Sequence, residues 1–339
     1  MDTHFSDIIP SIESVQVGLG STGYIPSRQI STALFLAMRL GKPILAEGPA
    51  GVGKTELAKA AAEFLGLPLV RMQCYDGLDE SKALYEWKYG KQLLYTQILK
   101  EKVSAVLSKD DTMESALNRL HEFDDIFFSE RFLEPRPLLK ALQEPKGAVL
   151  LIDEIDKADE EFEAFLLEIL SDHQVTIPEI GTISAVVKPI VILTSNNTRD
   201  LGDAMKRRCL HLHIGYPDAK LEEQIIDSRI PGIEASLRRQ LVSFVQQLRG
   251  LDLRKLPSVS ETIDWARASQ KDVLTAAAHL TIQDSLPATE LLARATAARA
   301  AVRTGDSLRR SAAESVLCRA HYRLKARDAA VNGPKPTTP

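Results

Sequence analysis

The chain has 339 residues, of which 44% are hydrophobic and 26% are charged, an ordinary composition for a soluble protein with one large or two modest domains. Its apolar runs are far shorter than the roughly 18 residues that a membrane-spanning helix needs, and its first residues lack the pattern of a secretory signal. Cys74, Cys209 and Cys318 lie far apart, which argues against a disulfide framework or a zinc site. We therefore expect a cytoplasmic protein with no transmembrane segment.

The net charge of −4 is unevenly distributed. From Leu291 onward there are eight Arg and two Lys against three acidic residues, a balance of +7, and the rest of the chain carries −11. A basic segment of this kind contacts nucleic acid, a membrane surface or an acidic partner. The alternative, which we favour, is a solvated helix face followed by a loose end.

The first predicted elements form a strand–loop–helix–strand unit. Residues 30–40 have the apolar spacing of a helix, 43–47 read as a short strand, 56–65 as an Ala-rich helix and 67–73 as a second strand. The loop after the first strand is GPAGVGKT, residues 48–55. This order is the one that a nucleotide-binding α/β sheet requires.

Further along the chain, strands and helices alternate and then give way to helices alone. Between residues 76 and 145 the pattern loosens around a charged helical stretch at 98–123. We then predict strands at 147–153, 189–194 and 210–214, a helix at 158–171, a hairpin at 175–187, and helices at 221–229, 233–249, 260–267, 273–280 and 291–324. This change of pattern predicts a domain boundary near 215–220.

The loop G-x-x-x-x-G-K-T predicts a phosphate-binding site. Glycines let backbone N–H groups converge on phosphate oxygens, and the helix that follows adds its positive N-terminal end. Lys54 would bridge the β- and γ-phosphates, and the Thr55 hydroxyl would ligate Mg²⁺. The residues assigned to the cradle are Gly48, Pro49, Ala50, Gly51, Val52, Gly53, Lys54 and Thr55.

Polar residues at two later strand ends complete the predicted site. Asp153 and Glu154 follow a buried strand about 100 residues after the loop; Asp153 would hold the Mg²⁺ shell and Glu154 would orient or deprotonate the attacking water. Asn196, at the tip of the next strand, would hydrogen-bond the γ-phosphate and that water. Asn197 is the second choice, and both asparagines have the alternative of forming a turn.

Basic residues precede the last predicted strand, and two histidines lie within it. Arg207 or Arg208 would reach the γ-phosphate of a neighbouring subunit as an arginine finger, although Lys206-Arg207-Arg208 taken alone reads as a solvated run of charge. His211 and His213 share a strand face without a further ligand, so we expect them to be partly buried structural residues.

These motifs together resemble a known family. GPAGVGKT, AVLLIDE, LTSNN and KRRC occur in the order and spacing of AAA+ ATPases, and the chain is similar to the MoxR family within that class. Residues 43–48, the long insert after the second strand, and 175–179 carry the resemblance, which spans residues 25–268. Residues 83–94 are closest to the CoxD-like subgroup, which is encoded beside molybdenum hydroxylases such as aerobic carbon monoxide dehydrogenase.

The resemblance implies an α/β fold: a P-loop AAA+ parallel-sheet ATPase subdomain followed by a small all-helical lid. It also implies a homo-hexameric ring that binds ATP and Mg²⁺ between neighbours, with Arg208 as the expected finger because it lies closer to the following strand. MoxR proteins are associated with maturation of metal-cofactor enzymes, often with a partner carrying a von Willebrand factor A-like domain. The arginine that opens the family's lid helix is missing from residues 257–262, where Arg254 or Arg267 would have to substitute.

The resulting organisation has five segments. They are an N-terminal segment 1–24, the ATPase subdomain 25–216 with inserts at about 75–145 and 175–187, the helical lid 217–280, a basic helical extension 281–330 and a disordered tail 331–339. The inserts would touch a client, and the aromatic residues Tyr85, Trp87 and Tyr89 are either part of that contact or packed core.

The leading functional hypothesis is an ATP-driven chaperone that activates a metal-cofactor enzyme. A nucleic-acid motor of the same ATPase class is the first alternative, supported only by the basic tail, and we consider a nucleic-acid partner the weaker prediction. A P-loop kinase is the second alternative, disfavoured because a kinase has no use for an interfacial finger. No Asn-Lys-x-Asp guanine signature follows a strand, which argues against GTP.

Overall fold

The structure is a computed structural model that describes residues 9–95, 97, 129–178, 180–251 and 255–270. The chain divides into two compact units, residues 1–215 and 216–339, and each is treated by itself. The predicted helices at 98–123, 273–280 and 291–324, and the predicted tail at 331–339, lie outside the described residues. Within the described part of the chain, no helix has the length and apolar character needed to cross a membrane.

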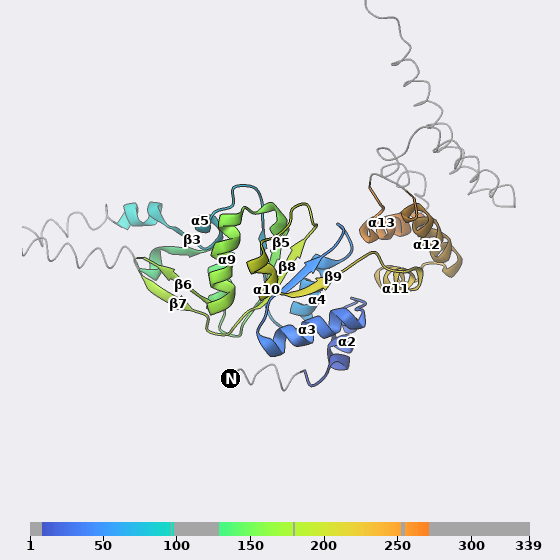
Figure 1. The fold of residues 1–339 in the computed structure, drawn as a ribbon, viewed down its shortest axis with the longest axis horizontal. Coiled ribbons are helices and arrows are strands. Elements are labelled where there is room, and N and C mark those ends of the chain that lie inside the picture. Colours follow the sequence, from blue (N-terminus) through green and yellow to red (C-terminus); the bar gives the residue numbers. More distant parts are fainter. Residues whose placement is uncertain (1–8, 96, 98–128, 179, 252–254, 271–339) are drawn as a thin grey trace, which may run out of the picture. The chain divides into compact units, whose positions relative to one another are not determined.

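A five-stranded parallel sheet, in the order β2-β5-β8-β1-β9, forms the centre of the first unit (Figure 1). Its strands are β1 (Ile44–Glu47), β2 (Leu69–Gln73), β5 (Val149–Asp153), β8 (Ile190–Ser195) and β9 (Leu210–His213). Every residue of β5 and β8 is buried, as expected for parallel strands covered on both faces. Because the strands are parallel, their carboxyl ends, and the polar residues that follow them, meet at one edge of the sheet.

Helices cover this sheet and bury its apolar side chains. They are α2 (Ile12–Ser21), α3 (Arg28–Leu40), α4 (Lys54–Leu65), α8 (Pro137–Gln143), α9 (Glu160–Asp172) and α10 (Asp203–Arg208). Helix α4 packs against β2, β5 and β8, and α2 packs against α3 and α4. Side-chain caps fix where three of these helices begin: the Ser11 hydroxyl accepts from Ser14 N, the Ser27 hydroxyl accepts from Ile30 N, and the Asp159 carboxylate accepts from Phe162 N.

The two inserts contain small antiparallel sheets. One consists of β3 (Tyr85–Trp87) and β4 (Leu133–Pro135), and the other of β6 (Gln174–Ile177) and β7 (Gly181–Ser184), which is the predicted hairpin. The short helices α5 (Glu80–Ala83), η1 (Glu130–Phe132) and η2 (Ile155–Lys157) complete the first unit. The aromatic cluster is divided: Trp87 is buried and meets Tyr85 edge-on at 5.9 Å, whereas Tyr89 is 66% exposed.

The second unit is helical over its described residues. It contains α11 (Ala219–Arg229), α12 (Ala235–Arg249) and α13 (Val259–Gln270). The fully buried Glu222 of α11 pairs with Arg249 of α12 through two contacts of 2.8 Å, and it also accepts from Gln246 at 2.8 Å and from Thr262 of α13 at 2.9 Å. One carboxylate therefore ties the three helices together.

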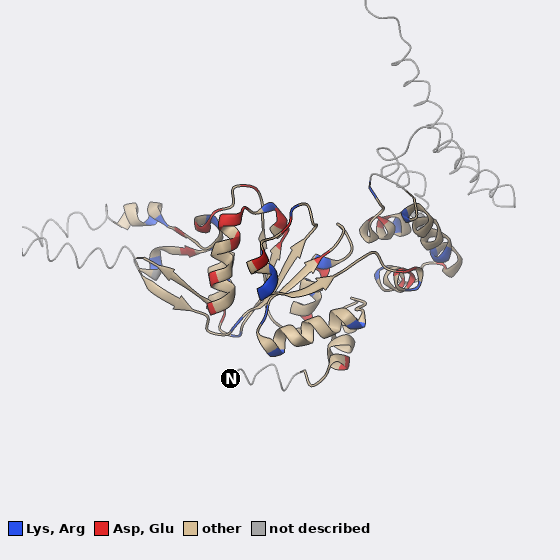
Figure 2. Ribbon diagram, in the orientation of Figure 1, with Lys and Arg blue, Asp and Glu red and all other residues tan. Residues whose placement is uncertain are grey.

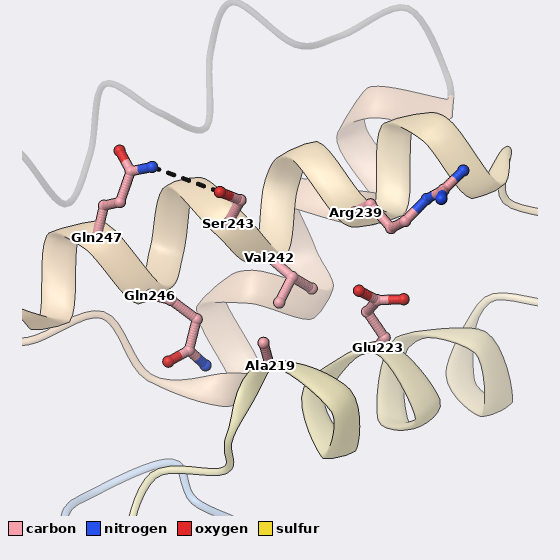
Figure 3. Close-up of a pocket in the computed structure, with 7 residues that line it drawn as sticks. All are labelled: Ala219, Glu223, Arg239, Val242, Ser243, Gln246 and Gln247. Atoms are coloured by element: carbon pink, nitrogen blue, oxygen red, sulfur yellow. Dashed lines mark hydrogen bonds between the residues drawn. The ribbon is translucent and has the colours of Figure 1, made fainter.

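An open cavity of about 380 Å³ lies between α11 and α12 in this unit (Figure 3). Figure 3 shows Glu223 and Arg239 on the two facing helices and a hydrogen bond of 3.4 Å from Gln247 to Ser243. The lining residues are Ala219, Glu223, Arg239, Val242, Ser243, Gln246 and Gln247. None of them belongs to the predicted nucleotide site.

The predicted α/β architecture is confirmed: the first unit is built on a parallel five-stranded sheet with covering helices, and the described part of the second unit is helical. One expectation was wrong. His211 and His213 are exposed rather than partly buried, because the strand period turns Leu212 inward and both histidines outward. The elements that were not expected include α2, the β3–β4 sheet and α5 of the first insert, and α8 in the same insert, which packs on β2 and β5.

Candidate nucleotide site

The Gly-rich loop has a backbone that only glycine accommodates at its critical points. A Cβ on Gly48 would lie 2.1 Å from the carbonyl oxygen of Ile214, and its φ is +148°. Gly53 has a φ of +101° and directly precedes α4. The loop consequently turns sharply from β1 into the N-terminus of α4, where free N–H groups and the helix dipole favour an anion.

Lys54 lies at the bottom of this loop with only 6% of its surface exposed. Its Nζ donates to the carbonyl oxygens of Gly48 at 2.6 Å and Pro49 at 2.7 Å, and to Asn196 Oδ1 at 2.9 Å. Burial lowers the pKa of the Lys54 ammonium, and the carboxylates of Asp156, Asp153 and Glu154 oppose that shift. The loop thus holds the ammonium in a site that suits a phosphate oxygen.

Asp153 ends β5 and faces Thr55 across the sheet edge. Its Oδ1 accepts from the hydroxyls of Thr55 at 3.0 Å and Thr194 at 2.6 Å. Its Oδ2 accepts from Arg71 Nη2 at 2.6 Å. The two predicted metal residues are therefore hydrogen-bonded to each other, in the position where a cation bound to a phosphate in the loop would meet both.

Glu154 has a left-handed backbone, with a φ of 57°. The Thr194 hydroxyl holds this turn by accepting from Glu154 N at 2.9 Å. The carboxylate is contacted from three sides: by Gln73 Nε2 at 2.9 Å, by Lys157 Nζ at 2.6 Å, and by Asn196 Nδ2 at 3.4 Å. The side chain remains 31% exposed, so its carboxylate is accessible to water.

Asp156 organises the loop that carries Asn196. Its Oδ1 accepts from Asn196 N at 3.2 Å, and its Oδ2 accepts from Thr198 N at 3.0 Å and Thr198 Oγ1 at 2.6 Å. Burial opposes the ionisation of Asp156, but these hydrogen bonds outweigh it and hold its pKa below the ordinary value. Asn197 has a φ of 57° and forms the turn, so Asn196 is the residue that reaches Lys54.

Arg207 and Arg208 lie in the last turn of α10, and both are exposed. Figure 2 shows this basic turn near the acidic residues of α9. Arg208 Nη1 donates to the carbonyl oxygen of Leu167 in α9 at 2.8 Å. Among the described residues, Arg207 makes no hydrogen bond or ion pair. The structure thus brings Lys54, Thr55, Asp153, Glu154 and Asn196 together and leaves both arginines on the surface.

Sequence reasoning missed the residues that support this site. They are Arg71, Gln73, Asp156, Lys157 and Thr194. Arg71 and Gln73 are alternate residues of β2, which pairs with β5 in the register Gln73 to Asp153. Polar residues spaced by two on a strand beside an acid-bearing strand are the signal that could have identified them.

The residues present fit a nucleotide with Mg²⁺. Among the described residues, no group of three or more His, Cys, Asp and Glu side chains could hold a metal ion alone. Mg²⁺ usually takes one or two protein oxygens and completes its shell with phosphates and water, and Thr55 with Asp153 supplies that number. Lys54 and the N-terminus of α4 provide the positive charge that phosphates require.

Comparisons with known proteins agree with this geometry. Residues 43–209 match the family model of the AAA domain (dynein-related subfamily). An uncharacterized protein of Staphylococcus aureus (strain bovine RF122 / ET3-1) is 25% identical over 235 residues, which cover 68% of this chain and 76% of that protein. An uncharacterized protein of Staphylococcus epidermidis (strain ATCC 12228 / FDA PCI 1200) is 25% identical over 236 residues, with the same coverage.

Two solved structures of Thermotoga maritima RuvB are also similar. One, of a point mutant, has 18% identity and a TM-score of 0.39, and covers 73% of this chain and 62% of RuvB. The other, described as a Holliday junction branch migration motor, has 16% identity and a TM-score of 0.39, and covers 78% and 66%. The chain therefore spans less than two thirds of the length of these structures.

Proposed function

We propose that this chain is a cytoplasmic MoxR-type ATPase that hydrolyses ATP with Mg²⁺ to remodel a protein client. The proposal starts from the match of residues 43–209 to the AAA domain and from the P-loop ATPase fold that this match indicates. The convergence of Lys54, Thr55, Asp153, Glu154 and Asn196 at one sheet edge is the observation that carries the proposal. Five polar residues from three separate strand ends meet there, an arrangement suited to bind and cleave a triphosphate.

The binding residues act on the phosphates. The backbone of residues 48–55 surrounds the phosphate oxygens, and Lys54 exchanges its contacts with Gly48 O and Pro49 O for the β- and γ-phosphates. Thr55 and Asp153 would hold Mg²⁺, and the ion would supply positive charge to offset the charge that develops on the phosphates. The Thr194 hydroxyl keeps the Asp153 carboxylate directed toward Thr55.

The hydrolytic residues act on water. Glu154 accepts a proton from, or orients, the water that attacks the γ-phosphate, and its 31% exposure leaves room for that water. Asn196 lies between Lys54 Nζ at 2.9 Å and Glu154 Oε1 at 3.4 Å. Its amide is therefore positioned to contact the γ-phosphate and the attacking water together.

The finger comes from a second copy of the chain. Arg207 and Arg208 are exposed and lie in α10 rather than in the loop of their own subunit. In a homo-hexameric ring, either guanidinium would reach the phosphate of the next subunit and stabilise the charge that develops there. Arg208 is our first choice, because it lies closer to strand β9 than Arg207 does.

The client we propose is a metal-cofactor enzyme of the molybdenum hydroxylase type, acted on with a partner that contains a von Willebrand factor A-like domain. The similarity of residues 83–94 to the CoxD-like subgroup supports this choice. The same segment exposes apolar side chains to solvent, Tyr89 at 66%, Leu93 at 61% and Leu94 at 53%. Exposed apolar residues in an insert are suited to touch another protein.

Two measurements test the proposal. Lys54→Ala removes the point charge from the cradle, and we expect equilibrium titration to show a loss of ATP affinity of at least a hundredfold, about 2.7 kcal/mol; affinity within a few-fold of wild type would refute the nucleotide site. For the client, the apo form of a molybdenum hydroxylase is incubated with its cofactor, ATP and the chain. Activation by the wild type but not by Glu154→Gln supports the chaperone, and equal activation by both refutes it.

A further inference from the structure

Strand β2 contributes a charged side chain to the acid that the proposed function assigns to Mg²⁺. β2 is an edge strand of the central sheet. Met72 is buried in the core, and its neighbours Arg71 and Gln73 are exposed. The alternation of the strand therefore places both polar side chains on one face, beside Asp153, which pairs with Gln73 in the sheet register.

Arg71 occupies one oxygen of the Asp153 carboxylate. Its Nη2 lies 2.6 Å from Asp153 Oδ2, and the Asp153 side chain is only 7% exposed. Thr55 and Thr194 already occupy Oδ1. A carboxylate offers about four lone-pair positions, so three donors, one of them a permanent cation, leave little of this group available to a metal.

The same guanidinium also connects the two acids of the site. Arg71 Nη2 lies 3.0 Å from Gln73 Oε1, and Gln73 Nε2 donates to Glu154 Oε2 at 2.9 Å. The Arg71 side chain is 50% exposed, so the guanidinium itself can move into water at little cost once another cation takes its place at the nearly buried Asp153. A guanidinium is always charged, and a fixed positive charge beside a cation site repels a divalent ion.

We propose that Arg71 competes with Mg²⁺ for Asp153 and so sets how strongly nucleotide binding depends on the metal. The inference rests on the proposed function, because it takes Asp153 as a residue of the Mg²⁺ shell. In the nucleotide-free chain, Arg71 neutralises a nearly buried carboxylate. When metal and nucleotide bind, the guanidinium turns outward, and the repulsion that it still exerts on the cation weakens the binding of Mg²⁺. Arg71 is thus a positioning residue that acts through Asp153.

The test measures binding and not turnover. The Kd of a non-hydrolysable ATP analogue is determined in EDTA and in excess Mg²⁺. The Kd in EDTA divided by the Kd in Mg²⁺ is the ratio that reports the contribution of the metal. Arg71→Gln removes the charge, and we expect this ratio to rise about tenfold over wild type, since solvent screens part of the repulsion. Arg71→Lys keeps the charge, and we expect a ratio close to wild type.

Arg136→Gln is the matched control. Arg136 is also about half-exposed, at 44%, and its partner is the carboxylate of Glu86 in the small β3–β4 sheet. We expect this variant to leave the ratio unchanged. An unchanged or lower ratio in Arg71→Gln, or the same rise in Arg71→Lys, would overturn the inference. A wild-type chain that binds the analogue equally in EDTA and Mg²⁺, or not at all, would instead remove the proposed metal or nucleotide site itself.

Discussion

Removal of the carboxylate of Glu222 is expected to destabilise the helical unit severely. Glu222 is fully buried, and the side chain of its partner Arg249 is only 6% exposed. Glu222→Ala leaves that guanidinium buried without its counter-ion, and it removes an acceptor from Gln246 and from Thr262. Breaking a buried pair from one side costs roughly 3–5 kcal/mol, which is a large part of the 5–15 kcal/mol that stabilises a typical domain.

A double-mutant cycle separates the cost of the broken pair from that of lost packing. Arg249→Met alone leaves Glu222 buried among uncharged donors, and we expect a similar loss. Glu222→Leu alone closes the cycle, and it leaves Arg249 without its counter-ion as Glu222→Ala does. Glu222→Leu combined with Arg249→Met removes both charges, and we expect it to cost only about 1–3 kcal/mol, because well-packed apolar replacements of buried pairs are close to neutral. The two single losses together exceed the loss of the double variant, so the coupling between the two positions should be at least about 3 kcal/mol.

Tryptophan fluorescence during urea unfolding gives the required free energies. The chain has two tryptophans, Trp87 in the first unit and Trp265 in the second. In a Trp87→Phe background, Trp265 alone reports, and it packs in the helical unit against Val245 and Leu248. A loss below about 1 kcal/mol in either single variant, or a double variant as costly as the sum of the singles, would refute the reasoning.

Three further predictions concern turnover, assembly and the cysteines. Glu154→Gln preserves shape and loses the base, so phosphate release should fall by roughly 10²-fold or more while titration shows retained ATP binding. Arg208→Ala should bind ATP but hydrolyse it about 10³-fold more slowly, and mixing it with subunits that cannot bind nucleotide should restore part of the rate; Arg207→Ala is measured in parallel. Burial raises the pKa of the Cys74 and Cys209 thiols to about 12, so at neutral pH they are protonated. With the third cysteine replaced by serine, the native chain should not react with a thiol reagent until it is unfolded.

A specific result would contradict each of these three predictions. Hydrolysis at the wild-type rate by Glu154→Gln would show that Glu154 is not the base. A wild-type rate per subunit that does not change on dilution, together with no rescue in the mixture, would exclude a finger in trans. A larger loss in Arg207→Ala than in Arg208→Ala would transfer the role to Arg207. Rapid reaction of either Cys74 or Cys209 in the folded chain would contradict the burial of that thiol.

The parts of the fold that the sequence predicted are those with strong local signals. The strands that became β5 and β8 are continuous apolar runs between polar residues, and this pattern identifies a buried parallel strand without knowledge of its neighbours. Helices α3 and α4 have clear apolar spacing, and Gly41 and Gly66 end them in the left-handed conformation. Helix α2 was missed because it is short and contains Gly18 and Gly20, which weaken a helical pattern.

The site was predictable in its core and not in its surroundings. The loop and the two acids belong to contiguous motifs, so their residues could be named from spacing alone. Arg71 and Gln73 reach the acids only because β2 lies next to β5, and strand order is a property of the whole sheet. Asp156 accepts hydrogen bonds from Asn196 and Thr198, which lie 40 and 42 positions away in the sequence. No local pattern encodes such contacts.

The left-handed backbone at Glu154 has an evolutionary consequence. A non-glycine residue with a φ of 57° sits in a conformation that costs roughly 1–2 kcal/mol and that glycine or asparagine adopts with less strain. Mutational drift that favours stability alone would therefore carry this position away from glutamate. Under the proposed mechanism, a glutamate at this position therefore exchanges folding stability for turnover.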